Sequence, residues 1–140
     1  IAVVLIVAAL SLGFLGATPT TSSHTLSPIS ANVVSKYLGG SWSINYVYTG
    51  SGYYAKIQML QQYKNSEVLY ENLTDSLGDQ LLILYVYPYH GQPTTYHSEF
   101  TSLITMNSGN AYIMLSYVGN STIVSQSQLQ ALANYIISNE

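Results

Sequence analysis

The chain has 140 residues, about one domain's length; 48% are hydrophobic, only 6% are charged, and the net charge is −3. A typical soluble domain has about 25% charged residues. The three lysines, Lys36, Lys56 and Lys64, are scattered and there is no arginine, so the basic footprint of a nucleic-acid binder is excluded. The absence of cysteine excludes disulfide frameworks, thiolate metal sites and cysteine nucleophiles.

The first 17 residues, IAVVLIVAALSLGFLGA, are uncharged and apolar almost all round. Such a segment is buried in lipid or protein, and its length is at the short limit for a membrane-spanning helix, which needs about 17–25 residues. A secretory signal peptide, a retained membrane anchor and an assembly segment all fit it. We expect 1–17 to be an apolar assembly or membrane segment with helix as its first conformation, 18–27 a polar joint, and 28–140 an extracellular head domain.

The position of the apolar run favours its retention. General signal peptidase would cut near Ala17, whereas a cut before the run leaves it in the mature chain. An apolar start, a short polar joint and a head rich in Ser, Thr and Tyr together resemble a mature archaeal type IV pilin. This resemblance implies an extracellular homopolymer that forms from a membrane-inserted precursor through the apolar segment.

The residues expected to make the assembly contacts are Val3, Val4, Leu5, Ile6, Val7, Leu10, Leu12, Phe14 and Leu15. A second mode of assembly stays open, because Pro19 would end a helix early. In donor-strand assembly the segment adds as a strand to a neighbouring subunit's sheet. The β-branched side chains of Val3, Val4, Ile6 and Val7 suit that conformation as well.

In the head, a short helix is predicted first. Ser27 suits its N-cap, Pro28 its first position and Gly39 its C-terminal end. Its apolar face comprises Ile29, Val33, Val34, Tyr37 and Leu38.

Strand patterns come next. The alternation in 41–49 predicts a half-buried strand, and Gly50-Ser51-Gly52 predicts a turn into a second strand at 53–62, forming a hairpin. A short strand at 67–71 followed by a polar loop is the preferred interpretation of the next stretch. The unbroken apolar run at 80–87 predicts a central strand buried on both faces.

The C-terminal half is expected to hold a loop at 88–95, strand or helix at 96–106, a turn at 108–110 and a strand at 111–118. Ser125 and Gln128 form a capping box for a final helix. Its apolar stripe is Leu129, Leu132, Ala133, Ile136 and Ile137. The predicted fold class is α+β: about five mainly antiparallel strands packed by the C-terminal helix.

The surface chemistry points outside the cell. Two sequons, at Asn72 and Asn120, are expected in loops and could carry N-linked glycans. The low charge resembles the composition of cell-surface proteins of acid-loving, heat-loving archaea. Fourteen tyrosines suit strands, core and subunit contacts, and they would also suit adhesion to surfaces or carbohydrates.

No catalytic or metal site is expected, and no cofactor. His90, His97 and Glu99 are too few and too scattered for a metal centre. No nucleophile elbow is present. The acidic series Glu67, Glu71, Asp75 and Asp79 is expected to be a solvated face or loop, without the spacing of an EF-hand.

These observations predict a structural subunit of an extracellular, pilus-like filament that serves adhesion or surface motility. The alternative is an extracellular binding module held by a single membrane span.

Overall fold

The computed structural model describes residues 26–119 and 124–140. The predicted N-terminal helix therefore lies outside the described residues, as do the nine assembly residues and Asn120. The described part is built on a six-stranded sheet in the order β1-β2-β3-β6-β5-β4. All the strand pairs are antiparallel. The strands are β1 (Trp42–Ser51), β2 (Glu67–Asp75), β3 (Gln80–Tyr87), β4 (Thr94–His97), β5 (Thr101–Ser108) and β6 (Ala111–Val118).

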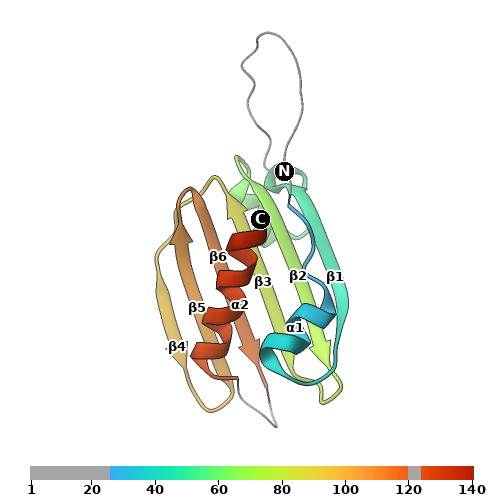
Figure 1. Ribbon diagram of the computed structural model, residues 1–140. Helices are drawn as coiled ribbons and strands as arrows, with labels where there is room; N and C mark the ends of the chain where they lie inside the picture. The colour runs from blue at the N-terminus through green and yellow to red at the C-terminus, as the bar shows by residue number, and fades with distance from the viewer. Residues whose placement is uncertain (1–25, 120–123) are drawn as a thin grey trace.

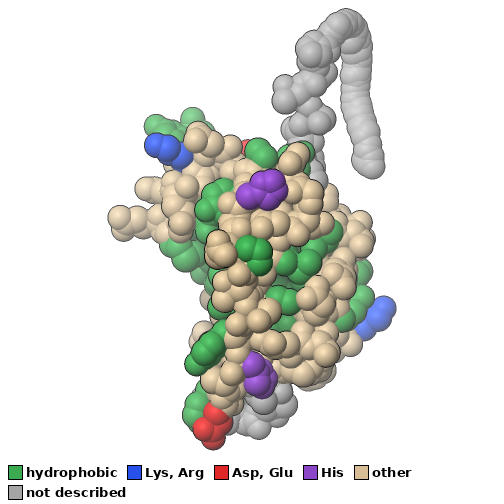
Figure 2. All heavy atoms as spheres, turned by 90° about the vertical axis from the view of Figure 1, so that its left-hand side faces the viewer, with side chains coloured by type: hydrophobic (Ala, Val, Ile, Leu, Met, Phe, Trp, Pro, Cys, Tyr) green, Lys and Arg blue, Asp and Glu red, His purple; other side chains and the backbone are tan. Residues whose placement is uncertain are grey.

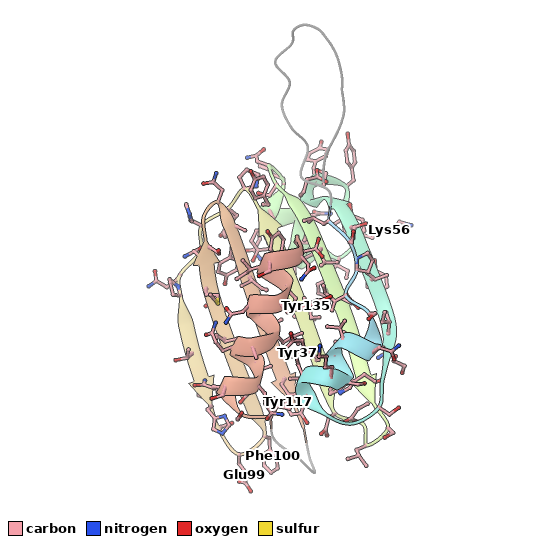
Figure 3. The ribbon with its side chains drawn as sticks, viewed as in Figure 1. Tyr37, Lys56, Glu99, Phe100, Tyr117 and Tyr135 are labelled. Atoms are coloured by element: carbon pink, nitrogen blue, oxygen red, sulfur yellow. The ribbon has the colours of Figure 1, made fainter. Side chains whose placement is uncertain are left out.

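Two helices, α1 (Ala31–Leu38) and α2 (Gln126–Asn139), lie on the same face of this sheet (Figure 1). This confirms the α+β class and a sheet packed by the C-terminal helix, with six strands where about five were expected. Figure 3 shows Tyr37 of α1 and Tyr135 of α2 between the helices, and their ring centroids are 5.6 Å apart. The two helices thus form one layer over the sheet.

The first helix begins later than predicted. Its N-cap is Ser30, whose hydroxyl accepts from the backbone N–H of Val33, and not Ser27. Ser27 and Pro28 instead lie in a segment without regular structure, in which the backbone N–H groups of Ser27 and Ile29 bond to side chains far along the chain. The predicted end is confirmed: Gly39 is the C-cap, with φ of 79° and its N–H donated to the Ser35 carbonyl.

The predicted hairpin between 41–49 and 53–62 is wrong. The chain after β1 forms two short 3₁₀ helices, η1 (Gly52–Tyr54) and η2 (Gln58–Tyr63). β1 pairs with β2, with Ser51 opposite Glu67. Gly52 allows this path, since a Cβ at that position would lie 2.2 Å from the Tyr63 carbonyl oxygen. Gly52 serves a close backbone approach between η1 and η2, and Gly50 lies within β1, so Gly50-Ser51-Gly52 is not a hairpin turn.

β2 is longer than the predicted strand at 67–71 and continues to Asp75, so no polar loop follows Glu71. The central strand is confirmed. In β3, Leu81, Ile83 and Tyr85 belong to the core under the helices, whereas Leu84 and Val86 belong to a second core on the opposite face. The η1–η2 segment covers that second core through Ala55, Leu60 and Tyr63.

The ambiguous stretch 96–106 contains strand and not helix, with β4 and β5 joined at 98–100. The turn at 108–110 and the strand after it are confirmed, and Gly109 takes φ of 60° between β5 and β6. The capping box of Ser125 and Gln128 is also confirmed. Leu129, Leu132, Ala133 and Ile136 of α2 are buried, as its stripe predicted, whereas Ile137 is half-buried.

Candidate functional site

Two carboxylates hold the backbone of the chain just before α1. The backbone N–H of Ser27 donates to Glu140 Oε1 at 2.8 Å. The backbone N–H of Ile29 donates to Glu71 Oε1, also at 2.8 Å. Both donors lie in the segment just before α1. The two glutamates, one from β2 and one at the C-cap of α2, therefore hold residues 27–29 in place. We call these residues, Ser27, Ile29, Glu71 and Glu140, the carboxylate clasp.

Glu71 is fully buried, with 0% of its surface exposed. Its Oε2 has no hydrogen-bond partner among the described residues. Burial raises the pKa of Glu71 to about 7; the hydrogen bond from Ile29 acts in the opposite direction, and the negative charge of Glu140 raises it further. The carboxyl is thus poised to change its charge near neutral pH.

Two other groups at this place, Glu140 and Tyr85, also have raised pKa values. Burial also raises the pKa of Glu140, and the hydrogen bond from Ser27 lowers it. Tyr85 of β3 is buried, and its pKa is raised by burial, then by the charge of Glu140, then by Tyr87. No lysine contributes to these shifts. The clasp therefore contains two carboxyl groups whose pKa values are raised by burial.

The acidic series does not form the solvated face or loop that the sequence predicted. Glu67 is exposed, but Glu71 and Asp79 are buried. For Glu71 the reason is the alternation of side chains in β2: Leu69, Glu71 and Leu73 lie on the helix-covered face, which is core. If the predicted strand had been extended to Asp75, it would have placed Glu71 on the same face as Leu69 and Leu73. The role of Glu140 depends on tertiary packing and has no local signal.

Asp79 has a structural partner. Its Oδ2 accepts the hydroxyl of Tyr117 at 2.5 Å in the interior of the protein. Burial and this hydrogen bond raise the pKa of Tyr117. Nearby, Asp75 Oδ1 accepts the N–H groups of Leu77 and Asp79, each at 2.9 Å, which closes the β2–β3 turn. These carboxylate oxygens stabilise the turn and a buried tyrosine.

The three residues considered for a metal site do not come together. His90 Nε2 lies 2.7 Å from the Gly109 carbonyl oxygen, whereas His97 Nδ1 lies 2.5 Å from Ser102 Oγ. The histidine side chains on the face shown in Figure 2 lie well apart. Glu99 follows the end of β4, so it does not share a strand face with His97, and Figure 3 shows it at the tip beside Phe100. Within 26–119 and 124–140, no group of three or more His, Asp or Glu side chains could hold a metal ion.

Asn72 does not lie in a loop, as expected of its sequon. It is a half-buried residue of β2, and its Oδ1 lies 3.5 Å from Asn45 Nδ2 on β1. The longer β2 again explains the difference. Asn72 faces away from the helices, because it alternates with Glu71 and Leu73.

The tyrosines divide between core and surface. Tyr63, Tyr85 and Tyr117 are buried. A ring cluster on the face away from the helices joins Tyr63 to Tyr89 at 4.9 Å and Tyr89 to Tyr112 at 5.5 Å. The exposed tyrosines are Tyr46, Tyr53, Tyr54 and Tyr96. Core and strand roles therefore account for several of the fourteen tyrosines.

Comparison of the chain with protein-family models, curated proteins and solved structures finds no match. Of the helices in the described residues, none has the length and apolar character needed to cross a membrane.

Proposed function

We propose that this chain is a structural subunit of an extracellular, pilus-like filament that assembles through its apolar N-terminal segment and serves adhesion or surface motility. The observation that carries the proposal is the uncharged run at 1–17, joined by a polar stretch to a head with its own buried core. Contacts between subunits that do not close into a ring would generate a helical filament. Each subunit is inserted in the membrane before assembly.

The energetics favour association of such segments. Burying about 1,000 Å² of apolar surface per subunit supplies on the order of 25 kcal/mol before the entropy cost of assembly. The carboxylate clasp supports the same role, because it fixes the point at which the segment leaves the head.

The proposal includes an extracellular location with N-linked glycans at Asn72 and Asn120. The low charge and the two sequons support it. The intact mass of protein purified from its native cells, compared with that of Asn72→Gln and Asn120→Gln variants, measures the occupancy of each sequon.

Electron microscopy of the full chain tests the filament itself. We expect filaments from the natural chain, and dispersed heads from a version that begins at Thr18. A sharper pair keeps the length unchanged: Leu5→Asp places a charge inside the apolar segment, and Thr20→Asp places the same charge in the polar joint. Leu5→Asp should abolish filaments and Thr20→Asp should retain them, since only the first forces a charge into an apolar interface.

The same experiment can contradict the filament proposal. If the natural chain gives only monomers that need detergent, the filament proposal fails. The single-span binding module then becomes the better account of this protein.

A further inference from the structure

The two edges of the sheet differ in how they are protected. Proteins shield exposed strand edges with short strands, prolines and charges. β4 follows this practice: it has four residues, Thr94–His97, and Pro93 precedes it. β1 has ten residues, Trp42–Ser51, with no proline and no charged side chain. At that edge of the described sheet, β2 is the only strand paired with β1 (Figure 1).

β1 also presents large apolar side chains to solvent. Ile44 and Tyr46 are each 41% exposed, and Val47 is 39% exposed. Its register against β2 is interrupted only between Ile44 and Tyr46. From Tyr46 to Ser51 the pairing is regular, which leaves an edge of about 20 Å at roughly 3.3 Å per residue. A long, uncharged and regular edge of this kind is a template for an added strand.

The chain itself contains a segment that fits this edge. Residues 3–7, VVLIV, are uncharged, and four of the five are β-branched, as favoured in strands. Because donor and edge both lack charge, their pairing takes no charge out of water. The eight residues 18–25 can extend to about 26 Å at roughly 3.3 Å per residue, enough to reach a neighbouring molecule.

We propose that the outer edge of β1, from Tyr46 to Ser51, accepts residues 3–7 of a second copy of this chain as an additional strand. The inference rests on the proposed function, and it names the surface that receives the N-terminal segment. Main-chain hydrogen bonds provide the affinity. Alternate donor side chains lie beside Val47 and Thr49 on the helix-covered face, and beside Tyr46 and Tyr48 on the opposite face.

Disulfide trapping in the full chain tests this pairing, because the natural sequence has no cysteine. Val47→Cys is combined with a single cysteine at position 3, 4, 6 or 7, and the assembled protein is oxidised. Residues that face each other across a strand pair meet the Cα separation of a disulfide, about 4.4–6.8 Å. We expect a ladder of covalent multimers for the donor positions that share a face with Val47. The matched control places the acceptor cysteine at Tyr96 of β4, which is 53% exposed.

The outcomes separate the pairing from the filament. A ladder with Val47→Cys and none with Tyr96→Cys supports the pairing. Filaments that crosslink only between two N-terminal cysteines overturn it and leave the filament proposal intact. A fast-migrating monomer overturns it as well, because the segment then pairs within its own chain. If the natural chain forms no filaments, the proposed function itself has failed.

A charge on the edge gives an independent measurement. Tyr46→Lys and Tyr96→Lys introduce the same residue at exposed tyrosines of the two edge strands. We expect Tyr46→Lys to lower the amount of sedimentable filament about tenfold or more. Tyr96→Lys should leave it unchanged. Equal loss in both variants, with unchanged thermal unfolding of the head, would overturn the assignment of the acceptor edge to β1.

Discussion

Glu71 Oε1 accepts the backbone N–H of Ile29 at 2.8 Å, across 42 residues of sequence and inside the core. Burial of a carboxyl group in the folded protein favours its neutral, protonated form over its charged form. The contact therefore couples the position of the chain before α1 to pH, and it gives the most direct prediction.

The protein should be more stable in mild acid than at alkaline pH. The folded-state pKa of Glu71 is raised from 4.5 to about 7, so the folded state binds this proton more tightly than the unfolded state. The stabilisation is complete below about pH 4.5 and is lost as pH rises through about 7. At 1.36 kcal/mol per pKa unit, the effect is on the order of 3 kcal/mol. Urea unfolding at pH 4.5 and pH 8 measures it.

Glu71→Gln removes the titration and keeps an oxygen for the N–H of Ile29. We expect this variant to match the natural protein at pH 4.5 and to exceed its stability at pH 8. Glu67→Gln, on the same strand but exposed, should leave the pH dependence intact. A natural protein whose stability rises from pH 4.5 to pH 8 would contradict the raised pKa.

Tyr117→Phe should destabilise the head by about 1–3 kcal/mol, because it removes the hydroxyl donated to the buried Asp79 carboxylate. Tyr53→Phe is the matched control, since Tyr53 is 62% exposed. Chemical denaturation at neutral pH distinguishes the two. Equal stability of both variants would show that the Asp79–Tyr117 hydrogen bond contributes nothing.

Ser125→Ala should cost about 1 kcal/mol by removing the capping box of α2. The hydroxyl of Ser125 accepts the N–H of Gln128 at 3.2 Å. Ser127 is an exposed residue in the first turn of α2, and Ser127→Ala is the control. Thermal unfolding should separate the two variants, and an equal melting temperature would contradict the role of the cap.

Filament formation should be nearly independent of ionic strength. Both the apolar segment and the β1 edge lack charged residues, so salt screening has no attractive ion pair to weaken. Sedimentation at low and at high sodium chloride concentration checks this. A steep loss of filament at high salt would point to a contact mediated by charge.

Local patterns predicted the elements whose limits are set by neighbouring residues. The capping box of Ser125, the apolar run of β3 and the turn at Gly109 each depend on residues a few positions apart. The same kind of evidence failed at Gly50-Ser51-Gly52, where alternation in 53–62 suggested a strand. That segment forms the 3₁₀ helices η1 and η2 instead, and its buried apolar residues pack on the second core. A short alternating pattern does not separate a strand from such a segment, and it carries no information on which strand lies alongside.

The sequence by itself determined that this protein has an uncharged N-terminal segment, no cysteine chemistry and a head of mixed helix and strand. Only the tertiary structure decided that β1 pairs with β2, that Glu71 lies in the core, and that Glu140 joins it at the start of the head. The physical reason is the range of the interactions. Capping and periodicity act within a few residues, whereas strand pairing and the burial of a carboxylate depend on segments that meet only when the whole chain has folded.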